Sequence, residues 1–222
     1  MEIQLDDISF GEVYHSEIVK DTITIVNDDS LILHVFVYKV PKYLNFQIES
    51  NQIPPHSSSK IVCTFYPDQV DKYGFLYNKV TTLLFNNEKK MQTKLLITAT
   101  ILPDVNYNDN IIEDKNAKIS FEESIKYIYI SKDDKKIECE FYFENVGNDD
   151  LKIYDVYMNH GCSVGDFSEI VSPGEKGHII IDCDDINDGK NYKKIINVIS
   201  NDPVKPQQEL RIMYQFVEDD VK

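Results

Sequence analysis

The 222-residue sequence contains no tryptophan, only eight glycines and no long hydrophobic run. The lack of tryptophan excludes the buried Trp that marks antibody-type domains, and the few glycines form no phosphate-binding loop. No stretch approaches the roughly 18 apolar residues that a membrane-spanning helix requires. The first residues, MEIQLDDISF, have neither the basic region nor the apolar region of an export signal. We therefore expect either a cytoplasmic protein or a mature form from which an export signal has been removed.

Basic residues are scarce as well. The chain has 23 Lys and Arg residues against 38 Asp and Glu residues, and its formal net charge is −15. This charge repels nucleic-acid backbones and anionic lipid surfaces. We therefore exclude nucleic acid as a partner and expect a protein partner, which the sequence does not identify.

Motifs of catalytic sites are missing. The sequence has no Gly-x-Ser-x-Gly elbow and no His-Glu-x-x-His helix. Paired carboxylates are present, but they lie at predicted turns and strand ends, where hydrated groups make poor general acids. These pairs are Glu122 with Glu123, Asp149 with Asp150, and Asp28 with Asp29. We therefore predict no catalytic residues, no cofactor and no enzyme activity.

Metal-ligand spacing is also absent among the five histidines, which are His15, His34, His56, His160 and His178. His160 and Cys162 are the one close pair, and two ligands do not complete a tetrahedral zinc site. We therefore predict no zinc site.

An acidic run, DCDDINDG, occupies residues 182–189. It is not an EF-hand, because Ile186 would fall where an oxygen ligand belongs. A weaker calcium site, which a metal-dependent hydrolase could use, would consist of Asp182, Asp184, Asp185 and Asp188. Charge runs are usually solvated, so we favour an acidic surface loop and predict no metal site.

The four cysteines are Cys63, Cys139, Cys162 and Cys183. There is no Cys-x-x-Cys, and the irregular spacings allow three complete disulfide pairings. Three of the cysteines share their parity with apolar neighbours in strand-like segments, which favours buried free thiols over a disulfide framework. Cys162 is expected in an exposed loop.

The sequence contains an internal duplication. Its clearest copy lies in residues 137–153, where an alternating strand is followed by an Asn-x-Gly turn and a second strand. An offset of 118 relates Asn27 to Asn145 and Ile53 to Val171, and it falls to 115 and then 114 near the end of each half. The segments ISFGEV (8–13) and ISFEES (119–124) open the two halves. A period above one hundred residues indicates a duplicated domain.

Each half contains about seven short alternating segments, which is typical of an antiparallel β-sandwich. In the first half they lie near residues 8–10, 18–26, 31–40, 44–48, 59–65, 77–85 and 94–101. In the second half they lie near residues 118–121, 136–145, 151–158, 164–167, 178–183, 192–200 and 209–216. We predict an all-β protein of two tandem immunoglobulin-like antiparallel β-sandwich domains, residues 1–102 and 118–222. A connector, residues 103–117, would dock against one domain through Ile111 and Ile112, and a disordered linker is the alternative.

These motifs resemble those of Hydin/ASH-type immunoglobulin-like domains, and are especially similar to an uncharacterised family common in exported proteins and lipoproteins of Bacteroidetes. In the second half the resemblance rests on Asn145, Gly147, Leu151, Ile153, Pro173, Gly174, Glu175 and residues 200–203 (SNDP). The first half has Asp29 at the turn glycine and His56 in place of the glycine after Pro55. The resemblance implies a non-enzymatic, extracytoplasmic β-sandwich in the periplasm or at the cell surface. A lipid anchor on the native precursor is left open.

One segment departs from this family. Members often have Cys-Gly-Cys-Thr after the third strand, whereas this chain has His160-Gly161-Cys162-Ser163. A vicinal disulfide or a thiol metal site in this segment is therefore not expected. Two further segments, Asp21-Thr22-Ile23 and Asp29-Ser30-Leu31, resemble the Asp-Ser/Thr-apolar sequence to which exported Bacteroidetes proteins attach O-linked glycans.

Fourteen tyrosines exceed what two small cores need, and tyrosine suits interfaces because its ring is apolar and its tip is polar. The alternation in two segments could turn some rings outward, and the residues concerned are Tyr127, Tyr129, Tyr154 and Tyr157. Packing on the outer sheet or at the domain junction is the alternative. We predict a protein-binding or scaffolding module of the bacterial cell envelope, with binding residues unassigned. The alternatives are a structural spacer that assembles edge to edge and a metal-dependent hydrolase.

Overall fold

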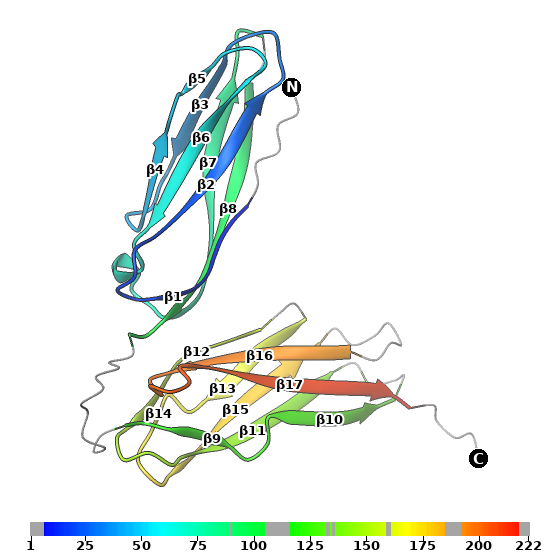
Figure 1. Cartoon of the computed structure of the whole chain (residues 1–222). Helices are drawn as coiled ribbons and strands as arrows, with labels where there is room; N and C mark the ends of the chain where they lie inside the picture. Colours follow the sequence, from blue (N-terminus) through cyan, green and yellow to red (C-terminus); the bar gives the residue numbers. More distant parts are fainter. Residues whose placement is uncertain are drawn as a thin grey trace. The chain divides into compact units, whose positions relative to one another are not determined.

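The computed structural model describes residues 7–88, 90–104, 116–131, 134, 136–158, 161–184 and 192–217. The chain divides into two compact units, residues 1–104 and 105–222 (Figure 1). Each unit is an immunoglobulin-like sandwich of two β-sheets, so the predicted all-β fold is confirmed. Ile111 and Ile112 of the predicted connector lie outside the described residues. Within the described ranges, no helix is long and apolar enough to span a bilayer.

The first unit has a larger and a smaller sheet. The larger sheet contains, in spatial order, β1 (Ile8–Tyr14), β8 (Lys90–Leu102), β7 (Gly74–Phe85), β3 (Leu33–Tyr38) and β5 (Gln52–Ile53). The smaller sheet contains β2 (Val19–Asn27), β6 (Ser57–Phe65) and β4 (Leu44–Ile48). A short 3-10 helix, η1 (Pro67–Gln69), follows β6.

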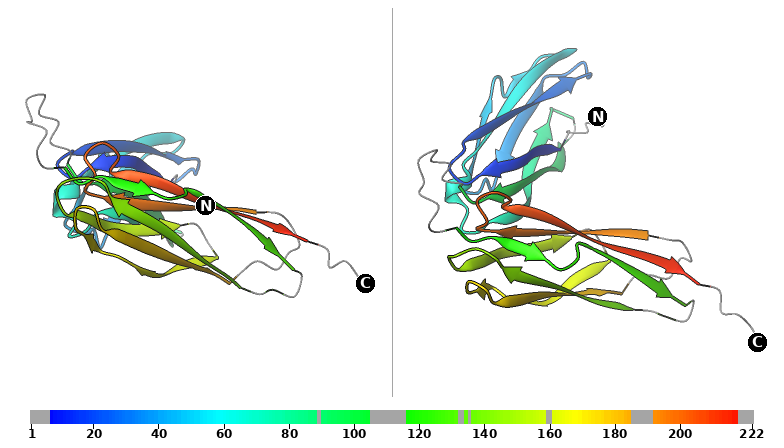
Figure 2. Two further views of the ribbon diagram at one scale, coloured as in Figure 1. Left: turned by 90° about the horizontal axis from the view of Figure 1, so that it is seen from below. Right: turned by 60° about the horizontal axis from the view of Figure 1, so that its bottom comes forward.

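The second unit repeats this plan. One sheet contains β10 (Ile125–Ile130), β17 (Gln207–Phe216), β16 (Tyr192–Ser200), β12 (Leu151–Met158) and β14 (Ile170–Val171). The other contains β13 (Cys162–Phe167), β15 (Lys176–Cys183), β11 (Ile137–Asn145) and β9 (Ile119–Phe121). Figure 2 shows β16 and β17, coloured orange to red, in one layer, with β15, coloured yellow, in the other.

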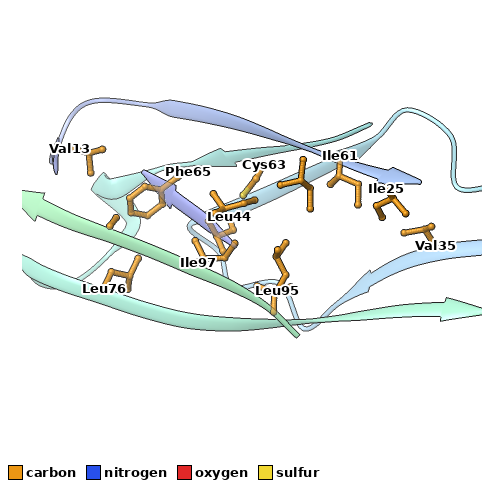
Figure 3. Packing of buried hydrophobic residues seen from close by; sticks show 14 of the residues in the cluster. Val13, Ile25, Val35, Leu44, Ile61, Cys63, Phe65, Leu76, Leu95 and Ile97 are labelled. Carbon is orange, nitrogen blue, oxygen red and sulfur yellow. The ribbon is translucent and has the colours of Figure 1, made fainter. Parts of the chain in front are cut away.

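The core of each unit lies between its two sheets, because alternate residues of each strand point to the same side. In the first unit, Ile61 and Phe65 of the smaller sheet point toward Leu95 and Ile97 of the larger one (Figure 3). All four side chains are fully buried. Burial of each such side chain contributes about 1.5–3 kcal/mol, so these cores are the main source of stability.

A buried asparagine occupies the same place in both units. The amide nitrogen of Asn27 donates to the carbonyl oxygens of Leu31 and Ile53, each at 2.9 Å. The amide nitrogen of Asn145 donates to those of Asp149 at 2.8 Å and Val171 at 2.9 Å. Both side chains therefore satisfy backbone groups that have been removed from water. This matching pattern confirms the offset of 118 through the middle of each half.

The segments ISFGEV and ISFEES form the first strand described in each unit, but the two strands are not equivalent. Residues 8–14 form β1, which pairs parallel with β8, whereas residues 119–121 form β9, which pairs antiparallel with β11. The structural counterpart of β1 is β10, which pairs parallel with β17, the last strand of its unit. A shared tripeptide is too short to identify equivalent strands, since the neighbouring strand decides the sheet to which each belongs. These two parallel pairs also depart from the fully antiparallel sheets that we predicted.

The offset near the end of each half differs from the prediction as well. Val35 faces Leu84 across the strands, whereas its counterpart Ile153 faces Ser200. Ser200 is therefore equivalent to Leu84. The predicted offset of 114 would instead make Ser200 equivalent to Asn86. A register irregularity between Ile153 and Asp155 accompanies this difference, so sequence alignment alone did not locate the equivalent residues.

All the predicted strands are present within two or three residues, apart from two: β1 ends four residues later than predicted, and β8 begins four residues earlier. Three strands were missed, namely β5, β10 and β14. The segment that forms β10 has apolar residues on both faces, because Tyr127 and Tyr129 alternate with Ile128 and Ile130. It therefore lacks the alternation that identified the other strands.

The prediction for two of the cysteines is wrong. Cys162 lies in β13, not in a loop, and forms a disulfide with Cys183. The two residues are directly opposite each other, because β13 pairs antiparallel with β15. Strand pairing, which the irregular sequence spacing does not reveal, brings the sulfur atoms together. The other two cysteines, Cys63 and Cys139, are buried free thiols as predicted.

Burial also changes the acidity of the free thiols. It raises the pKa of Cys63 to about 12, with a further contribution from the negative charge of Asp21. It raises the pKa of Cys139 to about 11. A neutral thiol is a poor nucleophile and metal ligand, so both cysteines act as small core side chains.

The turn glycine Gly147 is required for space. A Cβ atom there would lie 2.1 Å from the carbonyl oxygen of Asn116 and 2.6 Å from the backbone nitrogen of Lys118. Its φ is not among the positive values, so the turn needs this glycine for space and not for a left-handed backbone. Asp29 takes this position in the first unit, where its carboxylate accepts hydrogen bonds from Ser30 and Asn86.

Candidate functional site: the tyrosine face of the second unit

Strand β10 presents two tyrosines to solvent. Ile128 and Ile130 point inward, so Tyr127 and Tyr129 point outward and are 71% and 69% exposed. The strand lies at the edge of its sheet, and none of the strands that the structure describes pairs with its outer edge (Figure 1). The rings therefore stand on an accessible corner of the sandwich.

The neighbouring strands complete this surface. Met213 of β17 faces Tyr127 on one side and Lys193 of β16 on the other, while Gln215 faces Tyr129. Together these five residues form what we call the tyrosine face. They line most of a hollow of about 330 Å³, which is large enough for a few side chains of a partner.

The charges beside the tyrosine face are of mixed sign. Arg211 is ion-paired with Glu209, and Lys193 lies 4.0 Å from the same carboxylate. Two cations thus share one anion beside the aromatic rings. On a protein with a net charge of −15, this is a place that an acidic partner surface can approach.

Sequence analysis identified only part of this surface. Tyr127 and Tyr129 point outward, which the alternation allowed, but Tyr154 and Tyr157 lie on β12, two strands beyond β17 in the same sheet. Tyr154 is 37% exposed and Tyr157 is half-buried. The contributions of Met213 and Lys193 were missed, because they depend on the pairing of three strands.

The acidic run does not form a metal site in the part that the structure describes. Asp182 forms an ion pair of 2.9 Å with Lys136, and its hydrogen bond and charge raise the pKa of that lysine. Asp184 is exposed. Three further candidates, His160, Asp185 and Asp188, lie outside the described residues. Among the described residues, no group of three or more His, Cys, Asp or Glu side chains could hold a metal ion.

The carboxylate pairs have structural partners. Glu122 forms an ion pair of 2.6 Å with Lys176 and raises the pKa of that lysine through a hydrogen bond. Glu123 is ion-paired with Lys126. The remaining pairs, Asp28 with Asp29 and Asp149 with Asp150, lie in the two asparagine turns. None of these arrangements poises a carboxyl group for proton transfer.

The structure also brings together three residue types of hydrolase sites, which the sequence did not reveal. The ring of His178 lies 3.1 Å from a carboxylate oxygen of Asp166 and 3.2 Å from the hydroxyl of Ser168. The same hydroxyl accepts the backbone N–H of His178 at 3.1 Å. The side chain of Asp166 is 70% exposed, whereas the acid that orients a catalytic histidine is buried. We interpret the trio as a surface network that ties β13 to β15.

Three more histidines in the described ranges contact aromatic rings or lie in turns. His15 packs beside Tyr73 with 5.3 Å between ring centroids, and His34 stacks on Phe85 at 4.9 Å. His56 is exposed in the turn before β6. These positions agree with the absence of a ligand spacing in the sequence.

Comparison with sequence families gives one result. Residues 119–215, which lie in the second unit, match the family described as "Protein of unknown function (DUF1573)". No curated protein sequence matches the chain. The matched range includes both the turn of Asn145 and Gly147 and the residues of the tyrosine face.

Comparison with solved structures shows the fold. The chain is similar to a protein of unknown function from Porphyromonas gingivalis W83, with 13% identity and a TM-score of 0.77 over 96% of this chain and 99% of that one. These findings agree with the resemblance to an uncharacterised Bacteroidetes family, while the resemblance to Hydin-type domains stays a prediction.

Two further structures match with TM-scores below 0.5. One is the ASH/PapD-like domain 7 of human CEP192, with 10% identity and a TM-score of 0.37 over 46% of this chain and 86% of that one. The other is the CupB2 chaperone of Pseudomonas aeruginosa, with 10% identity and a TM-score of 0.34 over 96% of this chain and 100% of that one. Similarity at this level carries no argument about function.

Proposed function

We propose that the chain is a non-enzymatic protein-binding or scaffolding module of the bacterial cell envelope. The tyrosine face is the observation that carries this proposal. Tyr127 and Tyr129 expose about seventy per cent of their surface beside Met213, and Tyr and Met are enriched at protein interfaces. Rings that protrude in this way become anchors when a partner removes them from water.

The charges indicate the kind of partner. Lys193 and Arg211 lie beside the rings and share the carboxylate of Glu209. A partner with an apolar centre and a carboxylate at its rim would cover the tyrosines and pair with Lys193. We therefore expect a protein surface of this composition and not a nucleic acid.

The proposed location is the periplasm or the cell surface, and a cytoplasmic location is the alternative. The Cys162–Cys183 disulfide supports export, because disulfides persist in oxidising compartments and are rare in the cytosol. Thr22 and Ser30, at the centres of the two glycan-like segments, are both exposed. Fractionation of the native organism and intact-mass measurement of the chain would test both points. Recovery from the cytosol with reduced cysteines and no added sugar would contradict export.

Binding is tested with matched variants of exposed tyrosines. Immobilised wild-type chain and the Tyr127→Ala/Tyr129→Ala variant are incubated with an envelope extract of the native organism, and captured proteins are identified by mass spectrometry. Tyr77→Ala is the control, because Tyr77 is 53% exposed on the first unit, outside the tyrosine face. We expect one captured protein to be retained by wild type and control and lost by the double variant.

Affinity for that purified protein then decides the proposal. Loss of two anchor rings is expected to weaken binding by about thirtyfold or more, whereas Tyr77→Ala leaves the dissociation constant unchanged. Equal affinity of the wild type, the double variant and the control would contradict the proposal that the partner binds the tyrosine face. Growth of large particles with protein concentration in light scattering, without any partner, would favour the spacer that assembles edge to edge.

A further inference from the structure

The first unit has an open edge at which its two sheets separate. β4 is the last strand of the smaller sheet, and β3 of the larger sheet is paired on its outer side only at Leu33 and His34, where β5 meets it. A groove of about 560 Å³ lies between the two strands, and we call it the edge groove. Its lining residues are Val35, Phe36, Val37, Val40, Asn45, Phe46, Ile48, Glu49, Ser50 and Asn51.

The backbone of β4 has hydrogen-bonding groups that face away from β6. The carbonyl of Tyr43 accepts the N–H of Tyr66, and the N–H of Glu49 donates to Lys60, so odd-numbered residues bond toward β6. Backbone groups alternate in direction along an antiparallel strand. The N–H and C=O groups of Phe46 and Ile48 therefore point to the open side, where no strand of the described chain pairs with them.

The same holds for the facing strand. The N–H of Val35 donates to Asn51 on the outer side of β3, and Val37, two residues later, has its backbone groups on that side too. In the described ranges, the pairing of β3 with β5 includes only Leu33 and His34, so it does not reach Val37. Both strands that border the groove thus present unpaired backbone.

The groove has a mixed lining, in which polar surface predominates and several apolar side chains are only partly covered. Val37, Phe46 and Ile48 pack against the core but are only partly buried. Phe36 and Val40 are 37% and 38% exposed. An edge with unpaired backbone and half-covered apolar side chains has the features of a site that is completed by an added strand.

We propose that the edge groove binds an extended segment of a partner protein, which adds to β4 as a further strand of the smaller sheet. Its backbone pairs with Phe46 and Ile48, and alternate apolar side chains enter the groove and cover Val37. This site is separate from the tyrosine face and does not depend on it.

The charge of the groove restricts the occupant. Glu49 is the one charged residue among those that line it, and the whole chain has a net charge of −15. A neutral or basic segment is therefore favoured, whereas a second copy of this chain is repelled at low ionic strength.

Three synthetic peptides test the proposal. Acetylated Lys-Val-Thr-Val-Thr-Val-Lys has the alternation of a strand and basic ends. One control replaces the central valine with proline, which removes a backbone donor and disfavours a strand. The other replaces both lysines with glutamates. Each is titrated into the full-length chain, with amide NMR signals and hydrogen exchange as readouts.

We expect saturable shifts at the Phe46 and Ile48 amides and slower exchange of both, because each gains a hydrogen bond. The proline peptide should bind at least about tenfold more weakly, and so should the glutamate peptide. Val40→Ser, which removes an apolar side chain without adding charge, should weaken binding of the lysine peptide, and Glu49→Gln should reduce its advantage over the glutamate peptide. Tyr127→Ala/Tyr129→Ala should leave its affinity unchanged.

Three outcomes would overturn the inference. The first is an absence of shifts at Phe46 and Ile48 at millimolar peptide. The second is a set of shifts confined to β1, β10 or the tyrosine face. The third is a concentration-dependent change at the groove without peptide, which would identify a second copy as the occupant. Loss of function at the tyrosine face would change none of these readouts, so the two proposals fail separately.

Discussion

The two units share a buried asparagine but secure corresponding edge strands by different means. In the first unit, Leu44 of β4 lies opposite Phe65 of β6, and both are buried. At the same place in the second unit, Cys162 of β13 lies opposite Cys183 of β15 and is joined to it by a disulfide. Apolar contact and a covalent bond are thus interchangeable here, because either one holds the pair of strands.

The asparagine position is less tolerant. The amides of Asn27 and Asn145 each bridge a backbone carbonyl of the following turn and one of a neighbouring short strand. Few side chains offer an NH2 group at this length, and an unsatisfied buried carbonyl is costly. The duplicated frame therefore retains the polar residue and varies the apolar ones. Four experiments sharpen this comparison.

Removal of either asparagine amide should have the largest effect. Asn145→Ala removes the amide hydrogen bonds to the carbonyls of Asp149 and Val171 and creates a small cavity. We expect a loss of about 4 kcal/mol in the unfolding free energy of the second unit. Asn27→Ala should cost the first unit a similar amount. Hydrogen exchange with mass spectrometry measures each unit separately, which a chain without tryptophan does not allow by fluorescence.

The control for this experiment is Asn45→Ala, because Asn45 is exposed and its change should stay within about 0.5 kcal/mol. If Asn145→Ala were as mild as this control, the asparagine would not be the common structural centre of the two units. An effect in only one unit would show that the duplication has lost its equivalence at this position.

Reduction of the disulfide should destabilise the second unit alone. Cys162 and Cys183 are separated by 21 residues in the sequence, and closing a loop of this length contributes about 3 kcal/mol. We expect a reductant to lower the exchange protection of β13 and β15 and to leave β4 and β6 unchanged. Iodoacetamide at pH 8 should then label Cys162 and Cys183.

The buried thiols provide the internal control. Burial raises the pKa of Cys63 to about 12 and that of Cys139 to about 11, so both remain protonated at pH 8 and react slowly. Labelling of Cys63 in the folded chain would contradict this assignment. A fall in the protection of β4 after reduction would contradict the independence of the two edge strands.

Substitutions in the turn after the asparagine should have a smaller effect on stability, and the effect should differ between the two units. Gly147→Ala would place a Cβ atom 2.1 Å from the carbonyl oxygen of Asn116, and the backbone before β9 would have to move. We expect a loss of about 2 kcal/mol from the second unit. Asp29→Ala, at the same position of the first unit, should cost about 1 kcal/mol through its hydrogen bonds to Ser30 and Asn86. If Gly147→Ala and Asp29→Ala lowered the melting temperatures of their units equally, β9 would tolerate the displacement.

The comparison also shows what sequence could predict. Alternation located the strands of both cores, since a period of two is a direct consequence of strand geometry. It failed for β10, where Tyr127 and Tyr129 make both faces apolar. The disulfide depends on the register of β13 with β15, including an irregularity between Val164 and Asp166. The tyrosine face and the edge groove likewise arise from strands that meet only in the folded chain.

The smallest expected effect concerns the turns that precede β6 in the first unit and β15 in the second. His56 has a φ of 52°, in the left-handed region, and its counterpart Gly174 has a φ of 77°. A side chain in this region costs about 1 kcal/mol or more, so His56→Gly should relieve strain, although the greater freedom of glycine in the unfolded chain offsets part of the gain. We expect His56→Gly to stabilise the first unit by about 0.5 kcal/mol and Gly174→Ala to destabilise the second by about 1 kcal/mol. No Cβ contact confounds the second change, because nothing lies within 4 Å of the Cβ position at Gly174. Denaturant unfolding of both variants measures the two effects, and opposite signs to those expected would mean that the turns are not equivalent.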